Sequence, residues 1–200
     1  MNEQVILIGA SGHGKVIFDI VQAQGDIVIG FLDDNATGIC CGVPILGPVL
    51  NAKKYPEAKF IIAIGANHLR KRIAKELDVQ WHTAIHPSAV VSPSAVVGEG
   101  TVVMPNAVIQ TEAVIGYHCI INSGAIVEHE DHIGDYVHLS PGAALGGNVS
   151  IGSETHIGIG ACVRNNSSIC LGCVIGAGAA VVTYLTESGT YVGVPARIIK

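Results

Sequence analysis

Residues 84–107 read AIHPSA VVSPSA VVGEGT VVMPNA, four rows of six residues whose second residue is always Ile or Val. The same spacing continues without a gap to Leu185. Seventeen rows carry an aliphatic second residue: Ile85, Val91, Val97, Val103, Ile109, Ile115, Ile121, Val127, Ile133, Leu139, Leu145, Ile151, Ile157, Val163, Ile169, Ile175 and Val181. An apolar residue that recurs at one short interval over so many rows indicates a repeat architecture.

The other row positions describe a short strand followed by a tight turn. The sixth residue is usually small, as at Ala89 and Ala107, and the fifth is often Gly or Asn, as at Gly100 and Asn106. Gly and Asn tolerate the backbone conformations that turns require. Three such rows make one triangular coil, and each inward aliphatic side chain then lies about 4.8 Å from the one eighteen residues earlier. The rows therefore predict a parallel β-helix.

Residues 1–80 follow a different pattern, in which buried strands alternate with helices. The predicted elements are strands at 5–8, 27–32 and 60–64 and helices at 15–24 and 67–77. This alternation corresponds to one half of a Rossmann-like, doubly wound fold. We expect the boundary between this α/β domain and the β-helix at residues 78–83.

The composition excludes several classes of protein. Hydrophobic side chains make up 49% of the 200 residues and charged ones 14%, which excludes disorder. The net charge of −5 and the lack of a basic run argue against a nucleic-acid partner. No stretch approaches the roughly 18 apolar residues of a membrane span, and residues 1–14 do not resemble a signal peptide. We therefore expect a cytoplasmic protein without membrane contacts, whose six cysteines are reduced and mostly buried.

The segment GASGHGK at residues 9–15 joins the first predicted strand to the first predicted helix. Its glycines would let backbone N–H groups approach phosphate oxygens at a helix N-terminus. The segment is neither a dinucleotide loop, because Ser11 replaces a glycine, nor a Walker loop, because Val16 follows the lysine. Residues 9–15 therefore form either a phosphate-binding loop or a plain strand-to-helix turn. Asp33 and Asp34 after the second strand are candidates for ribose or base contacts, or for a solvated loop.

A second candidate site is the segment EHE at residues 128–130. The row register places these side chains at the turn and on the outside of the coil, so they are not expected in the core. A histidine beside a carboxylate is the standard arrangement of a general base, since the carboxylate fixes the tautomer and stabilises the imidazolium. His129 and Glu130 are therefore the candidates for acid–base catalysis.

The eighteen-residue register also predicts which side chains stack near this segment. Gly147 is expected above His129, where it and Gly146 would leave a channel beside the ring, and His138 is expected below His156. Solvated surface groups or a metal site are the alternatives for the histidines, although their spacing matches no common zinc pattern.

These motifs resemble those of bacterial nucleotide-sugar N-acetyltransferases of bacillosamine-type pathways, in the sialic acid O-acetyltransferase-like hexapeptide-repeat family. The matching segments are 9–14, 31–34, 63–65 with Asn67 and Arg70, 85–89, 128–130, 147–148 and 192–196. The resemblance implies a nucleotide-sugar-binding, Rossmann-like α/β half domain at residues 1–80. It implies a left-handed parallel β-helix of hexapeptide repeats with a C-terminal tail at residues 84–200, and a homotrimer with active sites between neighbouring β-helices.

The resemblance also implies roles for individual residues. His129 would be the catalytic base, and Glu130 would raise its basicity. Nucleotide-sugar contacts are implied for seven residues: Ser11, Gly12, His13, Asp33, Asp34, Gly65 and His68. Contacts with the co-substrate acetyl-CoA are implied for four residues: His138, Gly147, Ile159 and Ser168. Residues 193–197 would lie close to acetyl-CoA, and no metal is implied.

The expected reaction is direct N-acetylation of the 4-amino group of a UDP-linked 4-amino-4,6-dideoxy sugar, for the synthesis of a surface glycan or glycoprotein. His129 would take the proton of the attacking amine. A dTDP- or GDP-linked amino sugar as substrate, or O-acetylation of sialic acid, are alternatives within the same class. A trimeric metal-binding or assembly protein built on the same β-helix is the alternative from a different class.

Overall fold

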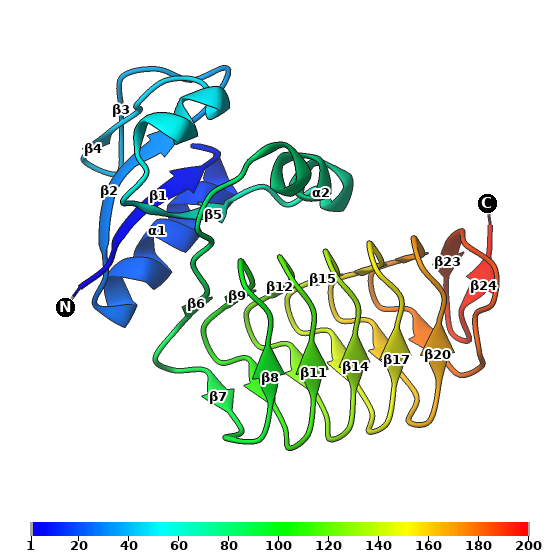
Figure 1. The fold of residues 1–200 in the computed structure, drawn as a ribbon. Helices are drawn as coiled ribbons and strands as arrows, with labels where there is room; N and C mark the ends of the chain where they lie inside the picture. The colour runs from blue at the N-terminus through cyan, green and yellow to red at the C-terminus, as the bar shows by residue number, and fades with distance from the viewer. Residues whose placement is uncertain (1, 200) are drawn as a thin grey trace.

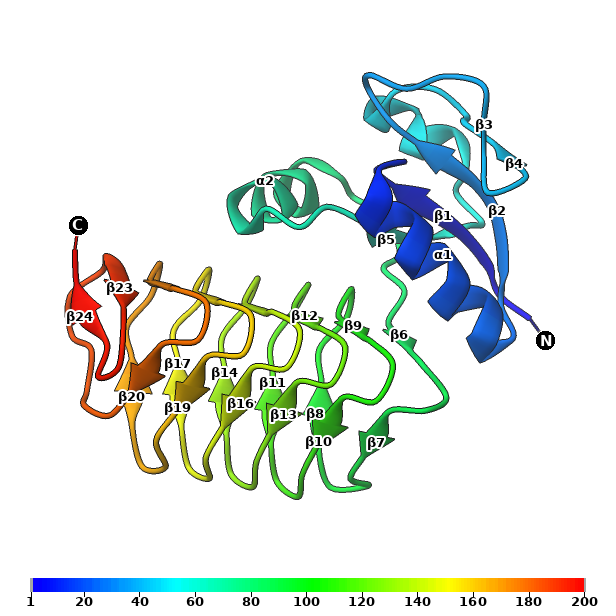
Figure 2. The same cartoon turned by 180° about the vertical axis from the view of Figure 1, so that it is seen from behind.

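The computed structural model describes residues 2–199, which form an α/β unit followed by a long, regular β-helix (Figure 1). Seen from behind, the α/β unit lies over the first coils, and helix α2 (Asn67–Glu76) extends along the β-helix toward the middle coils (Figure 2). No helix in the described range is long and apolar enough to cross a membrane.

The α/β unit is built on a parallel sheet of three strands in the order β2-β1-β5. These strands are β1 (Gln4–Ile8), β2 (Ile27–Leu32) and β5 (Lys59–Ile62). Residues 5–8 of the central strand are fully buried because helices and the β-helix cover both faces of the sheet. One face packs on helix α1 (Gly12–Gln24), and the other packs on α2 and the 3-10 helix η1 (Val49–Lys54).

The predicted strands and helices of this unit are present, with shifted ends and two additions. Helix α1 begins at Gly12 instead of residue 15, since the Lys15 N–H already donates to the Ser11 carbonyl at 3.1 Å. The hairpin of β3 (Ile39–Cys40) and β4 (Val43–Pro44) and helix η1 were not predicted. These elements are too short to carry a recognisable apolar period.

Each predicted six-residue row forms one two-residue strand. The seventeen strands are β6 (Ala84–Ile85), β7 (Val90–Val91), β8 (Val96–Val97), β9 (Val102–Val103), β10 (Val108–Ile109), β11 (Val114–Ile115), β12 (Ile120–Ile121), β13 (Ile126–Val127), β14 (His132–Ile133), β15 (His138–Leu139), β16 (Ala144–Leu145), β17 (Ser150–Ile151), β18 (His156–Ile157), β19 (Cys162–Val163), β20 (Ser168–Ile169), β21 (Val174–Ile175) and β22 (Ala180–Val181). Each strand from β6 to β19 pairs in parallel with the strand one coil further on, as at Val108↔Ile126.

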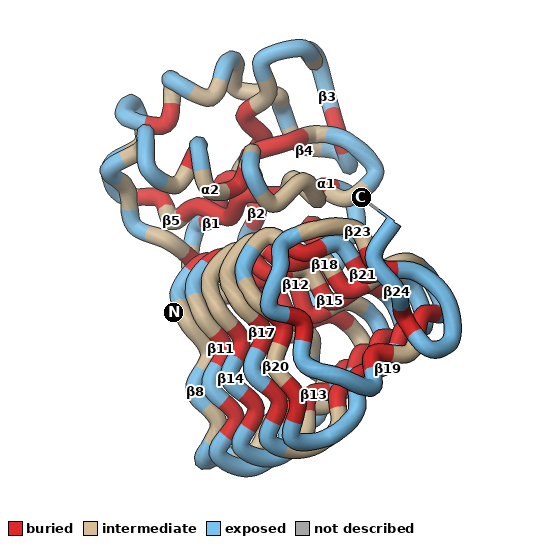
Figure 3. The backbone as a smooth tube through the Cα atoms, turned by 90° about the vertical axis from the view of Figure 1, so that its right-hand side faces the viewer, coloured by how far each residue is buried: buried red, intermediate tan, exposed pale blue. Residues whose placement is uncertain are grey.

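The pairing produces three sheets, which we name after their first strands. The β7 sheet holds β7, β10, β13, β16, β19 and β22, and the β8 sheet holds β8, β11, β14, β17 and β20. The β6 sheet holds β6, β9, β12, β15, β18 and β21, and it ends in β23 (Thr190–Val192) and the antiparallel β24 (Arg197–Ile198). The aliphatic second residues of the rows fill the interior of the β-helix. Figure 3 shows buried positions recurring in successive coils.

The fifth residue of every row from Gly100 to Gly178 has a positive φ angle. These turn residues form three columns, one at each corner of the triangle. The first corner column holds residues 100, 118, 136, 154 and 172, the second holds 106, 124, 142, 160 and 178, and the third holds 112, 130, 148 and 166. Gly and Asn were expected there, but His118, Glu130 and Tyr136 also adopt this conformation, which is uncommon for residues other than glycine.

The cysteines are all free, but only Cys40, Cys119 and Cys173 are buried. The expectation of buried thiols is wrong for Cys41 and Cys162, which are exposed. Cys162 is the first residue of its row, and that position points out of the coil. Cys41 lies in the turn of the β3–β4 hairpin.

Arg70 joins the α/β unit to the β-helix. Its side chain is 1% exposed and donates to carbonyl groups on both units. Within the α/β unit its Nη1 donates to the Gly65 carbonyl at 2.8 Å, and toward the β-helix its Nε donates to the His118 carbonyl at 3.0 Å. Its Nη2 donates to the Tyr136 carbonyl at 2.9 Å, one coil further along the first corner column. Burial lowers the pKa of Arg70 to about 10, so the guanidinium is still charged at neutral pH.

Two neighbours of Arg70 extend this joint. The Asn67 amide donates to the Glu154 carbonyl at 2.9 Å, so that α2 contacts three successive turns of the first corner column. Trp81 lies edge-on to the His118 ring, with 4.7 Å between the ring centroids. Because Trp81 is the only tryptophan in the sequence, its fluorescence reports on this joint.

We expect Arg70→Met to lower the free energy of unfolding by about 3 kcal/mol, since several buried carbonyls lose a charged donor. Arg72→Met, two residues further along the same helix, removes an exposed guanidinium and is expected to cost about 0.5 kcal/mol or less. Urea unfolding followed by Trp81 fluorescence measures both values. Equal stability of the two variants would contradict the role of Arg70.

Candidate active site

The loop at residues 9–14 turns tightly between β1 and α1. Gly14 is required by packing, because a Cβ atom there would lie 2.1 Å from the Gly9 carbonyl oxygen. Ser11 and Gly12 are exposed at the start of α1, where their backbone is open to a ligand. His13 instead points toward the β-helix, with its ring centroid 6.4 Å from that of His138. Its Nε2 atom is buried and has no hydrogen-bond partner among residues 2–199.

The two predicted acidic residues behave differently. The Asp33 carboxylate accepts backbone N–H groups of Ala10, Asn35 and Ala36 at 2.8–3.0 Å. Burial raises the pKa of Asp33, but these three donors outweigh it and hold the pKa below its usual value. Asp33 therefore organises the loop, whereas Asp34 uses only Oδ1, which accepts the Val49 N–H at 2.9 Å. Of the two carboxylates, Asp34 is the one with an oxygen free for a ligand.

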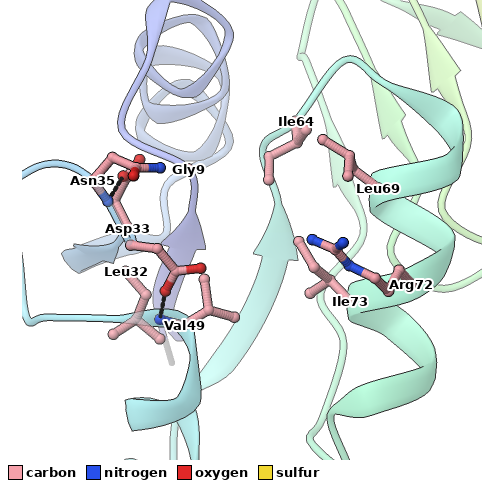
Figure 4. A pocket seen from close by; sticks show the side chains of 10 residues that line it. Gly9, Leu32, Asp33, Asn35, Val49, Ile64, Leu69, Arg72 and Ile73 are labelled. Atoms are coloured by element: carbon pink, nitrogen blue, oxygen red, sulfur yellow. Dashed lines mark hydrogen bonds between the residues drawn. The ribbon is translucent and has the colours of Figure 1, made fainter.

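A cavity of about 160 Å³ lies between these acidic residues and helix α2. Gly9, Asp33, Asp34 and Asn35 line one side, and Leu69 and Arg72 of α2 line the other. The Arg72 guanidinium extends from α2 into the space facing Asp33 and Asn35 (Figure 4). Arg72 was not predicted as a site residue, because the sequence alone indicates only a charged outer face of a helix.

His13, His118 and His138 lie at the joint between the two units and are largely buried. Burial, followed by the nearby Arg70 charge, lowers the pKa values of His13 and His118 to about 4. Burial, followed by the neighbouring His156, lowers the pKa of His138 to about 3. His138 stacks on His156 as predicted, with centroids 4.7 Å apart and rings within 1° of parallel.

His129 and Glu130 lie on the third corner column, in the turn between β13 and β14. Their side chains are 54% and 58% exposed, which excludes a core role. The His129 Nδ1 atom lies 3.0 Å from the Glu130 carboxylate, so Nδ1 carries the proton that Glu130 accepts and Nε2 is free to act as a base. The pair has the geometry that general base catalysis requires.

The space that the side-chain-free Gly146 and Gly147 leave is occupied, where a channel was predicted. A Cβ atom on Gly147 would lie 2.4 Å from Nε2 of His129, and one on Gly146 would lie 2.7 Å from the Asn165 backbone nitrogen. The two glycines therefore accommodate the His129 ring and the next coil. The register argument placed Gly147 over His129 correctly, but it could not show that the ring itself fills the space.

The other predicted residues are distributed over the chain. Gly65 and His68 line a second cavity of about 360 Å³ together with His156 of the β6 sheet. Ile159 is exposed beside the second corner column, and Ser168 starts β20 in the β8 sheet. The residues implied for acetyl-CoA thus occupy different sides of one β-helix, and their roles stay predictions.

The two halves of the candidate site lie on opposite edges of the β-helix. The α/β unit and α2 contact the first corner column, whereas His129 and Glu130 belong to the third. In Figure 1 the turn that precedes β14 lies at the lower edge, away from the α/β unit above. A single chain therefore does not bring Asp34 and His129 into one site.

No group of three or more His, Cys, Asp or Glu side chains in residues 2–199 is arranged to hold a metal ion. The available chemistry is that of a histidine–carboxylate pair on the β-helix and a polar cavity in the α/β unit. A hexapeptide β-helix with a histidine–carboxylate pair on its surface, joined to such an α/β unit, is the architecture of a two-domain acyltransferase of the hexapeptide-repeat class.

Comparison with known proteins identifies the family within this class. Residues 4–77 match the model of the PglD N-terminal domain. The acetyltransferase domain of PglB from Neisseria gonorrhoeae, solved with acetyl coenzyme A, is similar over 100% of both chains, with 39% identity and a TM-score of 0.95. PerB from Caulobacter crescentus, solved with CoA and GDP-perosamine, is 37% identical over 98% of this chain and 97% of its own, with a TM-score of 0.95.

A curated relative points to the same family. UDP-N-acetylbacillosamine N-acetyltransferase of Bacillus subtilis is 44% identical over 111 residues, which are 51% of this chain and 51% of that protein. The match thus spans about half the length of the curated relative. The chain belongs to the PglD-type family of nucleotide-sugar N-acetyltransferases, and the predicted fold, an α/β half domain before a left-handed β-helix, is confirmed.

We expect His13, His118 and His138 to stay neutral between pH 5 and pH 8, because their pKa values lie at or below about 4. The unfolded chain binds protons on these rings below pH 6.5, so the free energy of unfolding should fall as the pH is lowered from about 6.5 to about 4. Ring nitrogen shifts in ¹⁵N NMR report each protonation directly. A midpoint above pH 6 for any of the three would contradict the buried joint.

Proposed function

We propose that the protein transfers the acetyl group of acetyl-CoA to the 4-amino group of a UDP-linked 4-amino-4,6-dideoxy sugar. The observation that carries this proposal is the exposed His129–Glu130 pair, with its free Nε2, on the β-helix of a chain in this family. The curated Bacillus subtilis relative, whose name specifies a UDP-linked substrate, supports the choice of nucleotide. The GDP-perosamine complex of PerB makes a GDP-linked amino sugar the alternative.

The proposed reaction requires only proton transfer and correct placement. The neutral amine nitrogen attacks the thioester carbonyl carbon, and Nε2 of His129 accepts the proton that the nitrogen loses. Glu130 accepts the Nδ1 hydrogen and stabilises the imidazolium that results. The carbon–sulfur bond then breaks, and the imidazolium returns the proton to the CoA thiolate. The products are the acetamido sugar and free CoA thiol.

Residues 1–80 would bind the nucleotide sugar in this proposal, and residues 84–200 would supply the acetyl-transfer site. The cavity beside Asp34 has a carboxylate oxygen free to accept from a base or ribose, and Arg72 faces it with the opposite charge. The open N-terminus of α1 at Ser11 and Gly12 suits the diphosphate, since N–H groups and the helix dipole favour anions there. Acetyl-CoA would bind along the β-helix near His129.

A homotrimer would bring the separated halves of the site together. The outward first residues of the β7 sheet are all small or apolar, and each is exposed or half-buried: Val90, Val108, Ile126, Ala144, Cys162 and Ala180. This face adjoins the third corner column, so a neighbouring copy that covers it would meet His129. We therefore place each site between the α/β unit of one subunit and the His129 turn of another, in a cytoplasmic enzyme that uses cytoplasmic acetyl-CoA.

Release of CoA thiol should be observed with acetyl-CoA and a UDP-linked 4-amino sugar, and should be weaker with dTDP- and GDP-linked sugars. His129→Ala should lower kcat by about 100-fold or more, because the amine proton has no acceptor. His86→Ala, which removes a half-buried ring whose hydrogen bonds within residues 2–199 are to Ser88, is the matched control and should keep wild-type kcat. Thiol release with a GDP-linked sugar alone would show that the substrate is GDP-linked instead of UDP-linked. No thiol release with any sugar of the panel would overturn the proposal.

Subunit mixing tests whether the site is shared. His129→Ala and Asp34→Ala chains should each be nearly inactive, but co-expressed chains should regain about a quarter of wild-type turnover, since random trimers contain some sites with both residues intact. The measurement is thiol release by purified mixed trimers, with mixed His129→Ala and Glu130→Gln chains as the control that cannot complement. No recovery in the first mixture would place the whole site in one chain.

A further inference from the structure

The hydrogen-bond ladder of the β-helix has a gap at the turn that carries His129. From His86 to Gly176, the third residue of each row donates its backbone N–H to a carbonyl of the neighbouring coil. Within residues 2–199, Glu128 is the exception in this series. Strands β13 and β16 accordingly pair only at Ile126↔Ala144, whereas the other neighbouring row strands pair through two residues. The backbone therefore stops pairing with the neighbouring coil directly before His129.

The carboxylate of Asp131 takes over the N–H group that this gap releases. Its Oδ2 accepts the Glu128 N–H at 2.9 Å, and its Oδ1 accepts the Val149 N–H of the next coil at 2.8 Å. The side chain is completely buried, at a row position where Ala is commonest. Asp131 thus closes the His129 turn on one side and ties it to the following coil on the other.

Two threonines elsewhere in the β-helix show what is particular about Asp131. Thr101 occupies the same row position, and its hydroxyl accepts the Cys119 N–H, which belongs to the residue eighteen positions later. Thr155 accepts the Cys173 N–H in the same way. In both cases the hydroxyl donates onward to a carbonyl, and the ladder is complete. Asp131 makes the same bond to the next coil, but it uses its second oxygen to replace a missing ladder bond.

This arrangement fixes the position of the His129 ring. The His129 carbonyl accepts the Asn148 N–H at 2.9 Å, and the ring lies over Gly147. Asp131 holds both ends of this contact, since it binds Glu128 just before His129 and Val149 just after Asn148. A reacting group displaced by about 1 Å can cost about 100-fold in rate. A carboxylate that prevents such a displacement would matter to catalysis without touching the substrate.

We propose that Asp131 is a positioning residue that lets the His129 turn leave the ladder and holds it against Gly147 and Asn148. This inference rests on the proposed function, in which His129 is the base. The charged groups that face Asp131 are Glu128 and His129. Burial raises the pKa of Asp131 to about 6, while the two N–H donors and the nearby His129 oppose that rise.

The kinetic test compares Asp131→Ala with Thr101→Ala. Each removes a buried acceptor from the next coil and leaves the Ala that other rows carry, so both should fold and lose a few degrees of Tm. Asp131→Ala should lower kcat about 10-fold to 100-fold with little change in the KM for either substrate, and Thr101→Ala should keep wild-type kcat. Wild-type kcat in Asp131→Ala, or an equal loss in Thr101→Ala, would overturn the proposal.

A second readout does not depend on turnover. In ¹⁵N-labelled wild-type protein, the amide shifts of Glu128 and Val149 should titrate together with a midpoint near pH 6, as their shared acceptor gains a proton. Asp131→Asn should abolish this titration. Amides that do not titrate would overturn the assignment even if the enzyme is active. A clear titration in a protein without acetyltransferase activity would instead leave Asp131 in place and refute the proposed function.

Discussion

Backbone hydrogen bonds between coils, in an eighteen-residue register, organise the whole β-helix. This register aligns the fifth residues of the rows into three corner columns. The columns present carbonyls and side chains at regular intervals. The α/β unit is attached through one column, where Arg70 and Asn67 bind the carbonyls of three successive coils. His129 and Glu130 lie on another column, so the register fixes both where the α/β unit is anchored and where His129 projects.

Arg70 holds the α/β unit on the β-helix. Within residues 2–199 the buried guanidinium has only carbonyl and amide acceptors and no carboxylate partner. Burial is the main cause that lowers the pKa of the neighbouring His118, and the charge of Arg70 adds to it. The same guanidinium binds the Gly65 carbonyl, which belongs to the loop implied in nucleotide-sugar binding. Firm attachment of this loop to the β-helix suits a transferase in which two substrates must meet at a fixed geometry.

Much of this could be predicted from the sequence because the rows are local and periodic. The β-helix, the α/β alternation, the His138–His156 stack and the exposed His129–Glu130 pair all follow from short-range patterns. Arg70, Arg72 and Asp131 could not be assigned from such patterns, since their partners are distant in the sequence or are backbone groups. Asp131 in particular occupies a small-residue position, and only the missing bond of Glu128 shows why a carboxylate is there.

In the proposed assembly one subunit supplies the nucleotide-sugar site and another supplies His129. A crystal structure of the protein with CoA and an unreactive UDP-linked 4-amino sugar analogue would test this arrangement. We expect the nucleotide beside Asp34 of one protomer and the C4 substituent within hydrogen-bond distance of Nε2 of His129 in a neighbouring protomer. A sugar bound wholly within one chain, with its C4 group remote from every His129, would contradict it.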